Sequence, residues 1–204
     1  GAATSDPVPV EPYTGALAKT IKFFSKTEHG RFRFVTKFTD IESLLGINHR
    51  YHTTIRFSIN AQPIVENYEH FAPSLDKRLE AARKVIGAEY PVGFIIGPVI
   101  LFDGWQGQYE KMLNQLQNYL KDGAQGSVSF EVISHRFTSR AKNVILNIYP
   151  NSTLPMDEDT RKYKFGQFGY GKYIYPPEQI AVINAFFTQG LKERFPNSPI
   201  DYII

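Results

Sequence analysis

The chain has 204 residues, 42% of them hydrophobic, which suits one large domain with a substantial core. Its formal charge is only +3, so bulk charge does not make it a nucleic-acid binder, and any such footprint must come from local clusters of cations. The chain has no cysteine, which excludes disulfides, thiolate nucleophiles and cysteine-ligated zinc or iron–sulfur centres formed by this chain alone.

The histidines and the hydropathy pattern exclude further classes. No two histidines have the i, i+4 spacing of a helical metalloprotease site, so we predict no metal site in this chain alone. No apolar run approaches the length of a membrane span, and the first residues do not read as a signal peptide. We therefore expect a soluble intracellular protein with no membrane partner.

The first residues and the strand-like segments come next in chain order. Pro7, Pro9 and Pro12 predict an irregular opening, which is followed by a helix-like pattern over residues 17–27. Four short apolar runs then fit β-strands of four to seven residues. These runs are Arg33–Phe38, Thr54–Ile59, Val92–Ile96 and Ser127–Ile133.

Helical patterns separate most of these strands. Ser74 is placed to cap a helix that runs to about Ile86, with Gly87 as its stop signal. Further helices are predicted over residues 108–120 and 140–149, and over residues 177–195 after a first-turn proline. The connection between the first two strands is too short for us to expect a helix there.

This alternation predicts an α/β fold with parallel strands in right-handed βαβ units. The strand count is too low for a complete eight-stranded barrel. We predict a partial (β/α) TIM-type barrel over residues 1–204 as a single domain, with an added β-hairpin and a C-terminal helix.

Polar side chains follow the predicted strands at their carboxyl ends, the edge that holds the site in parallel α/β proteins. They are Lys37, Ser58, Asn60, Gly97 with Pro98, and His135 with Arg136. An amine, a hydroxyl, an amide and an open glycine backbone suit a ligand with a carboxylate and several hydroxyls or ring nitrogens. Taken singly, each residue also has an ordinary structural explanation. The set contains no nucleophile or acid–base pair, which argues against a common hydrolase or a stand-alone sugar- or phosphate-binding enzyme.

Residues 162–175 (KYKFGQFGYGKYIY) form the most distinctive stretch. Lysines alternate with aromatic residues around three glycines, which predicts a hairpin with a basic, aromatic tip. The rings can stack on bases and the lysines can contact phosphates, so the pattern is typical of a nucleic-acid contact. The alternative is a surface hairpin whose rings pack on its own domain.

Six segments of the chain resemble spore photoproduct lyase, in order and from end to end. They are GAATSD at the start, RFRFVTKF at 31–38, IRFSIN at 55–60, RLEAARKVIGAEYPVGFIIGPV at 78–99, FEVISHRFT at 130–138 and RKYKFGQFGYGKYIY at 161–175. The resemblance covers only the carboxyl-terminal part of that enzyme. It implies a cytoplasmic radical S-adenosylmethionine enzyme of a spore-forming bacterium, which repairs the methylene-bridged thymine dimer.

The resemblance also implies cofactors and their contacts. In this family a [4Fe-4S] cluster on a CxxxCxxC loop cleaves S-adenosylmethionine, and the resulting radical removes a hydrogen from the lesion. Ser5, Lys37 and Ser58 match the family's S-adenosylmethionine contacts, with Lys37 as the partner of the methionyl carboxylate. Gly97 falls where the family places a small residue, often alanine, near the cofactor.

In the same way, the hairpin at 160–176 matches the family's DNA wedge, which fills the gap left when the linked thymines leave the stack. The implied partner is double-stranded DNA that contains the lesion. The implied DNA-binding residues are Gln167, Phe168, Tyr170, Lys172 and Tyr173. At 167 and 168 the family tends to have arginine and tyrosine, and at 170 an aliphatic residue. The resemblance therefore does not by itself imply that this chain has the family's specificity for the lesion.

Two departures concern the chemistry itself. Ala3 occupies the position of the family's hydrogen-donor cysteine, and its methyl group cannot donate hydrogen to a carbon radical. The cluster loop lies upstream in the family, so an upstream radical S-adenosylmethionine half, on the same or a separate chain, is an implied partner. One explanation is a fragment, with Ala3 natural or engineered; the other is a natural homologue that kept DNA binding and lost catalysis. The alternative function is therefore a non-catalytic DNA-binding module.

Overall fold

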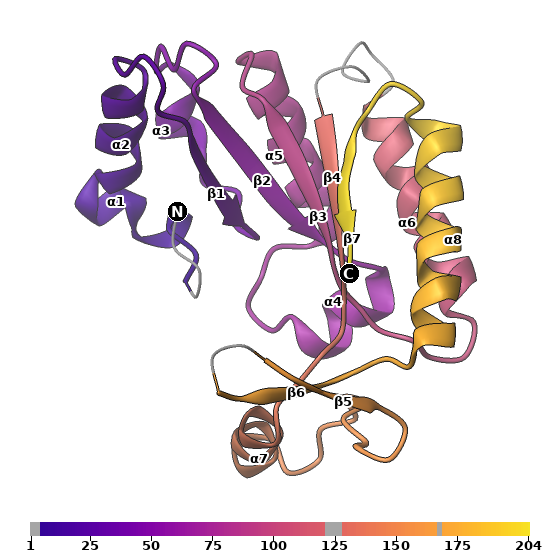
Figure 1. The fold of residues 1–204 in the computed structure, drawn as a ribbon. Helices are drawn as coiled ribbons and strands as arrows, with labels where there is room; N and C mark the ends of the chain where they lie inside the picture. Colours follow the sequence, from indigo (N-terminus) through magenta and orange to yellow (C-terminus); the bar gives the residue numbers. More distant parts are fainter. Residues whose placement is uncertain (1–4, 121–127, 167–168) are drawn as a thin grey trace.

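Five parallel strands form the central sheet of the protein. A computed structural model describes residues 5–120, 128–166 and 169–204. The strands are adjacent in the order β1-β2-β3-β4-β7 (Figure 1), and each pairs in parallel with its neighbour. This confirms the predicted α/β class with parallel strands. Their bounds are β1 Phe32–Thr36, β2 Thr53–Ile59, β3 Val92–Val99, β4 Val128–Ser134 and β7 Ile200–Ile203.

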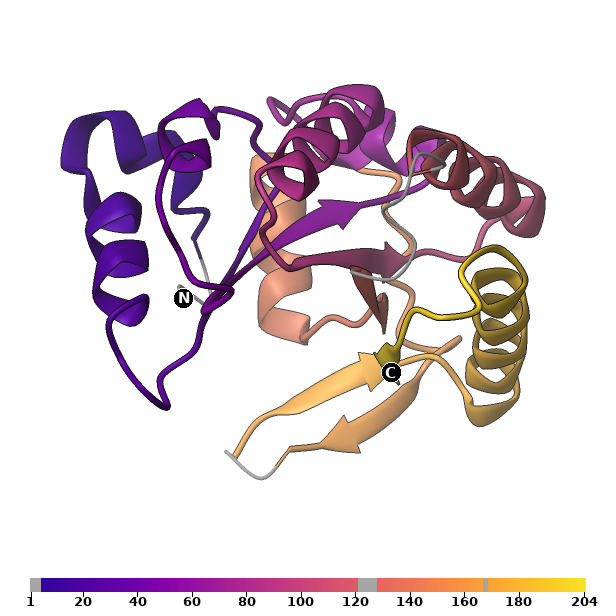
Figure 2. The ribbon, with the colours of Figure 1, turned by 90° about the horizontal axis from the view of Figure 1, so that it is seen from above.

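Helices cover the outer face of this sheet. They are α2 (Ala16–Phe24), α5 (Leu75–Gly87), α6 (Trp105–Tyr119) and α8 (Pro177–Arg194), and Figure 2 shows them along one side of the strands. Alternate strand residues point toward these helices and are fully buried, as Ile55, Phe57 and Ile59 are in β2. The hydrophobic core therefore lies between the sheet and its helices.

The other face of the sheet carries a polar network. Arg56 of β2 donates two hydrogen bonds to the Glu131 carboxylate of β4, at 2.7 and 3.0 Å, and the Tyr202 hydroxyl of β7 donates to the same carboxylate. Gly93 of β3 lies between them, and a Cβ there would be 2.9 Å from Cγ of Arg56. The glycine therefore lets the arginine cross the middle strand, and the network ties β2, β4 and β7 together.

Several predicted features of the first half were wrong in detail. The opening is not irregular, because it contains a 3-10 helix, η1 (Val8–Val10), and a one-turn helix, α1 (Glu11–Thr14). Pro12 fits the first turn of α1, where its missing N–H is not needed. The Glu11 carboxylate then accepts the N–H groups of Leu17 at 2.7 Å and Ala18 at 3.0 Å, so it caps α2.

Three further elements depart from the sequence prediction. A one-turn helix, α3 (Glu42–Leu45), occupies the short connection between β1 and β2, and α4 (Gln62–Tyr68) was not predicted. The predicted C-terminal helix is confirmed as α8, but it is followed by a strand that was not predicted, β7, which pairs with β4. At α5, the Ser74 side chain makes no capping hydrogen bond and Gly87 is the last helical residue rather than the stop.

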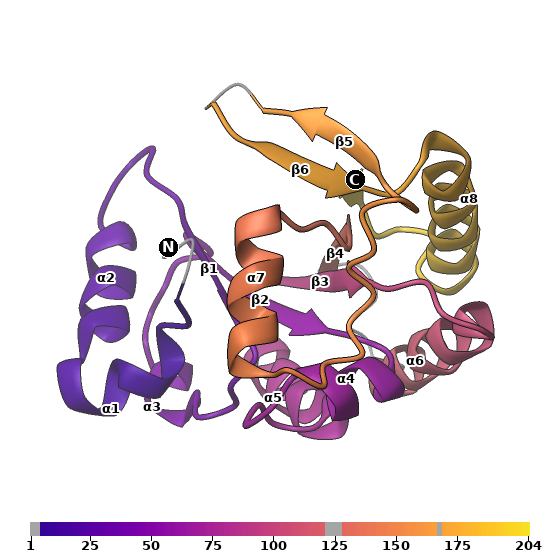
Figure 3. The same ribbon diagram turned by 90° about the horizontal axis from the view of Figure 1, so that it is seen from below.

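The predicted hairpin is confirmed, and it lies at the carboxyl ends of the sheet strands. It consists of β5 (Lys162–Phe165) and β6 (Gly171–Ile174), paired antiparallel, and it follows helix α7 (Ser139–Ile148). Thr138 caps α7 by accepting the Ala141 N–H at 3.0 Å. Figures 1 and 3 show α7 and the hairpin beyond the arrowheads of the sheet strands. No helix in the described ranges is long and apolar enough to cross a membrane.

Candidate functional site

Lys37 is the first residue after β1, and it is held at both its backbone and its side chain. Its N–H donates to Oδ2 of Asp6 at 2.7 Å, and the same carboxylate oxygen accepts the Thr36 hydroxyl at 3.0 Å. The Lys37 ammonium donates to Oε1 of Glu69 at 2.8 Å. Because the Lys37 side chain is 33% exposed and that of Glu69 only 4%, the amine sits at the rim with its partner beneath it. Asp6 also brings neighbouring Ser5, which is exposed, to the end of β1.

Glu69 connects Lys37 to a second cation, Arg78. Arg78 lies on α5 with its side chain fully buried, and one guanidinium nitrogen is 2.6 Å from Oε2 of Glu69. The same nitrogen donates to the Ser58 carbonyl at 3.0 Å, and Nε donates to the Pro73 carbonyl at 2.8 Å. One buried carboxylate thus faces two cations and leaves this trio with one net positive charge. Such an arrangement favours an incoming carboxylate at the exposed cation.

Ser58 lies near the end of β2, beside this trio. The residue is 7% exposed, and its hydroxyl makes no hydrogen bond to any residue in the described part of the chain. Its own carbonyl is fixed by Arg78. The hydroxyl is therefore available to a ligand at the same edge as the Lys37 amine.

Asn60 and Gly97, two further residues of the predicted ligand set, have structural roles in the fold. Asn60 is fully buried and its amide is used within the protein, so its place in the predicted ligand set was wrong. Nδ2 donates to the Pro98 carbonyl at 2.9 Å, and Oδ1 accepts the Tyr109 hydroxyl at 2.8 Å. Gly97 is buried in β3, where a Cβ would lie 2.9 Å from the Ile133 carbonyl oxygen. It permits the close approach of β3 and β4.

A cluster around Arg161 fastens the base of the hairpin to the end of β4. The guanidinium donates to the His135 carbonyl at 2.9 Å and to the Pro155 carbonyl at 3.1 Å, and it stacks 3.6 Å from the Tyr175 ring centroid. The Tyr175 hydroxyl accepts the Leu101 N–H at 2.9 Å. Burial, with a smaller contribution from Arg161, lowers the pKa of His135 to about 4. His135 is therefore a neutral imidazole at neutral pH, and its Nδ1 lies 3.2 Å from a guanidinium nitrogen of Arg161.

The hairpin has one aromatic face and one cationic face. Tyr163 and Tyr173 are directly opposite each other, with ring centroids 5.2 Å apart, and the Tyr173 ring stacks on Phe137 at 5.3 Å. The Tyr173 backbone also exchanges two hydrogen bonds with Phe137, at 2.7 and 3.2 Å. Hydrogen bonding of the Tyr173 hydroxyl to Glu158 raises the pKa of that tyrosine. The Tyr173 ring thus packs on its own domain, as the alternative interpretation predicted, whereas Tyr163 and Phe165 of the same ladder are 54% and 69% exposed.

The remaining predicted DNA contacts lie on the other face or at the tip. Lys164 and Lys172 form a pair on the face opposite the tyrosines, and Lys172 is 5.9 Å from the Tyr170 ring. Tyr170 is 52% exposed at the tip. Gln167 and Phe168, like Ala3, lie outside the described residues.

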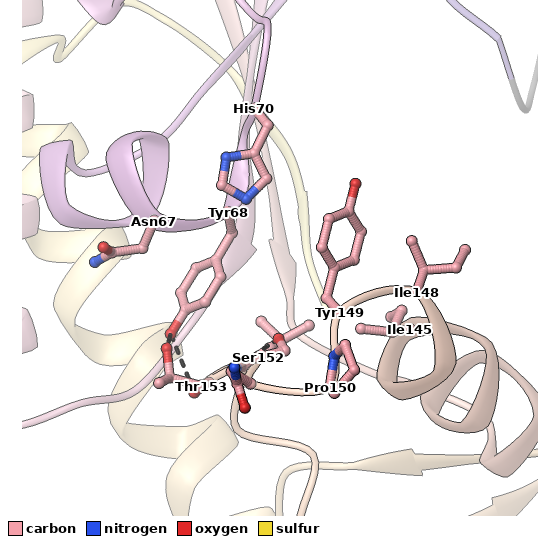
Figure 4. A pocket seen from close by; sticks show the side chains of 11 residues that line it. Asn67, Tyr68, His70, Ile145, Ile148, Tyr149, Pro150, Ser152 and Thr153 are labelled. Carbon is pink, nitrogen blue, oxygen red and sulfur yellow. Dashed lines mark hydrogen bonds between the residues drawn. The ribbon is translucent and has the colours of Figure 1, made fainter.

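A cavity of about 520 Å³ lies between the end of α4 and the end of α7 (Figure 4). The Tyr68 hydroxyl donates to the Thr153 carbonyl at 3.1 Å and so links the two walls. The His70 and Tyr149 rings lie 6.0 Å apart at its mouth. The lining contains no carboxylate, lysine or arginine, and none of the residues predicted from the sequence. The chain neighbours of Glu69, Tyr68 and His70, both line this cavity, but Glu69 itself and the cations of the Lys37 site do not.

The residues present do not fit an iron–sulfur cluster. The chain has no cysteine, and the described ranges contain no group of three or more His, Asp or Glu side chains that could hold a metal ion. They do fit an anionic cofactor group, because the partly exposed Lys37 amine and the unengaged Ser58 hydroxyl lie at the same edge of the sheet. Glu69 and Arg78 were missed, since no local pattern marks them, whereas Arg161 was noticed only as part of a run of cations and not as the anchor of the hairpin.

Comparisons with known proteins show to which family the chain is similar. A family model described as spore photoproduct lyase matches residues 1–204. A spore photoproduct lyase from Clostridium acetobutylicum is 50% identical over 204 residues, which are 100% of this chain and 60% of the relative. The Bacillus subtilis enzyme is 40% identical over 199 residues, 98% of this chain and 58% of the relative. The chain therefore spans about three-fifths of the length of these relatives.

Solved structures give the same result. A spore photoproduct lyase double mutant with bound AdoMet and dinucleoside spore photoproduct has a TM-score of 0.97 and 39% identity. A spore photoproduct lyase complexed with dinucleoside spore photoproduct has a TM-score of 0.98 and 38% identity. In both cases the match covers 100% of this chain and 60% of the solved chain.

Proposed function

The chain belongs to the spore photoproduct lyase family, and from this we propose that it supplies the cofactor and lesion-DNA contacts of a DNA-repair lyase. The proposed whole enzyme is a radical S-adenosylmethionine lyase that reverts the methylene-bridged thymine dimer to two thymines. Its proposed substrate is double-stranded DNA in the cytoplasm of a spore-forming bacterium. The proposed partner is the upstream half, which would carry the cluster on the same or a separate chain.

The observation that carries this proposal is the Lys37 amine, held by Glu69 at the rim of the strand ends and close in the fold to the open Ser58 hydroxyl. An ammonium can take the methionyl carboxylate of S-adenosylmethionine through a charge-assisted hydrogen bond. Ser58 and Ser5 would bind polar groups of the same molecule, and the Gly97 backbone would lie beside it. When bound, S-adenosylmethionine would supply the hydrogen-abstraction chemistry of the reaction.

The proposed role of the hairpin is to hold the damaged DNA over this mouth. Its position beyond the strand ends supports that role, as does its fastening through Arg161 and Phe137 (Figure 3). We propose that Gln167, Phe168, Tyr170, Lys172 and Tyr173 contact the lesion or its neighbours. Tyr173 would act mainly by holding the hairpin in place against Phe137, since its ring and hydroxyl already have partners.

Position 3 would be the hydrogen-donor position, and Ala3 cannot perform that step. Restoring the thiol with Ala3→Cys, in a complete protein with its cluster loop, is expected to raise lesion repair. Unchanged repair in that variant would remove Ala3 from the donor role.

The second candidate function is a non-catalytic DNA-binding module, which the absence of cysteine from the chain favours. The two functions differ in what the chain recognises. Titration calorimetry with S-adenosylmethionine and fluorescence anisotropy with matched damaged and undamaged duplexes separate them. The lyase proposal predicts cofactor binding and preference for the damaged duplex. Duplex binding that ignores both the lesion and the cofactor would contradict it and support the module.

A further inference from the structure

A groove of about 410 Å³ lies between the cationic face of the hairpin and the ends of β4 and β7. Figures 2 and 3 show the end of β7 beside the hairpin. Three cations line the groove: Arg136 after β4, Lys164 on β5 and Lys172 on β6. Its apolar lining includes Ile174, Ile180 and Ile203, and none of the described residues that line it has a carboxylate side chain.

The register of the hairpin makes this charge cluster costly in the free protein. Lys164 is directly opposite Lys172, and like charges in that position destabilise an antiparallel pair. Within the described ranges no ion pair or hydrogen bond engages Arg136, Lys164 or Lys172, and the nearby Glu158 pairs with Lys142 at 3.5 Å instead. Two facing lysines do not stabilise the β5–β6 pair. Because no group in the described part of the chain neutralises them, the arrangement indicates an anionic ligand.

The packing of the opposite face fixes where these lysines point. Side chains alternate along a strand, so the stacking of Tyr173 on Phe137, with Tyr163 opposite Tyr173, turns Lys164 and Lys172 away from Phe137. A Cβ at Gly171 would overlap the Tyr163 ring, so the glycine makes room for that packing. The cations are therefore held toward the groove by the aromatic face, and not by a partner of their own.

We propose that this groove binds the sugar–phosphate backbone of the DNA strand that flanks the lesion. Three cations from three segments match successive phosphates, and the isoleucines provide an apolar surface for the deoxyribose between them. Among the described lining residues only Phe165 is aromatic, and strand alternation places its side chain on the face of Tyr163, which argues for the backbone and against a stacked base as occupant. This inference rests on the proposed function and adds a second contact, separate from the Lys37 site and the hairpin tip.

The test compares a duplex of about 20 base pairs containing the lesion with the dinucleoside lesion alone, which has no flanking backbone. Arg136→Ala and Lys164→Ala are each expected to weaken duplex binding about 5- to 10-fold at low salt. The slope of log affinity against log salt concentration should fall by about the amount that one phosphate contact contributes. Their affinity for the dinucleoside should stay unchanged. Lys111→Ala on α6 and Lys192→Ala on α8 remove the same charge from exposed positions away from the groove, and they should bind both probes as the unaltered chain does.

A charge reversal separates binding from folding. Lys164→Glu would pair with the opposite Lys172, so its thermal midpoint should equal or exceed that of the unaltered chain while duplex affinity falls further than in Lys164→Ala. Duplex affinity and salt slope that stay unchanged in Arg136→Ala and Lys164→Ala would overturn the groove and leave the proposed function standing. Equal losses for duplex and dinucleoside would also overturn it, because the residues would then belong to the lesion site. A chain that binds neither probe would overturn both proposals.

Discussion

The ammonium nitrogen of Lys37 lies 2.8 Å from Oε1 of Glu69, whose side chain is only 4% exposed. A free lysine at a strand end would lose considerable rotamer freedom on binding a ligand. Here Glu69 has already fixed the amine, so less entropy is lost when a carboxylate arrives. Glu69 is therefore a positioning residue for the proposed cofactor contact, and Arg78 compensates the charge that this role buries.

Glu69→Gln is expected to destabilise the fold by about 3 kcal/mol, because it leaves the buried Arg78 guanidinium without its counter-charge. Urea unfolding measures the change. The matched control is Glu42→Gln, which breaks the exposed pair with Lys84 and should have no measurable effect. Similar small losses in both variants would contradict the buried network.

Arg161→Lys is expected to loosen the base of the hairpin, because an ammonium cannot reproduce the planar stack on Tyr175 and the forked hydrogen bonds. We expect faster hydrogen exchange at the Tyr173 amide, which donates to the Phe137 carbonyl at 2.7 Å. Arg140→Lys, at an exposed position on α7, is the control and should leave that amide unchanged. Equal exchange in all three proteins would show that Arg161 does not fasten the hairpin.

Gly97→Ala is expected to cost about 1–3 kcal/mol, since the added methyl group would meet the Ile133 carbonyl at 2.9 Å inside the sheet. Gly87→Ala provides the contrast, because no atom lies within 4 Å of a Cβ at the end of α5. That variant should be neutral or stabilising by up to about 1 kcal/mol. Thermal or urea unfolding of both variants measures the difference, and a neutral Gly97→Ala would mean that β3 and β4 can separate freely.

Acidification is expected to destabilise the protein through His135. Its folded-state pKa of about 4 is below the ordinary 6.5, so the unfolded state binds the proton more readily. The stability from a neutral His135 is complete above pH 6.5 and is lost as the pH falls toward 4. His135→Gln should lose less stability than the unaltered chain between pH 7 and pH 4.5, as followed by urea unfolding.

The exposed His29 supplies the control for this measurement, because its side chain is 91% exposed. His29→Gln should retain the pH dependence of the unaltered chain. If His135→Gln also retained it, burial of that imidazole would not be the cause.

The sequence predicted the strands and their polar ends well, because strand periodicity and parallel topology are local signals. Lys37 and Ser58 were found in this way, and the hairpin from its glycines and alternating residues. Glu69 and Arg78 could not be found, because their roles depend on tertiary contacts with residues 32 and 20 positions away. Strand β7 was missed because IDYI is short and polar at one position, and only its pairing with β4 makes it a strand.

The interpretation of the hairpin also changed. Its pattern suggested that the aromatic rings stack on bases and that the lysines contact phosphates. The sequence could not tell which of the rings would instead pack against the protein itself. Tyr173 packs on Phe137, whereas Tyr163 contacts only the edge of this pair through Tyr173 and stays as exposed as Tyr170 at the tip. Which face of the hairpin turns toward the domain depends on the position of Phe137. The alternation of residues within the hairpin gives no information about that position.

The affinity of the chain for S-adenosylmethionine, with and without Lys37, tests the central proposal most directly. A charge-assisted hydrogen bond contributes about 1.5–3 kcal/mol, so Lys37→Ala should weaken binding roughly 10- to 100-fold in titration calorimetry. The exposed Lys19→Ala should bind as the unaltered chain does, and Lys37→Ala should keep its thermal midpoint because Glu69 still pairs with Arg78. Equal dissociation constants for the unaltered chain and Lys37→Ala would contradict the assignment of this site.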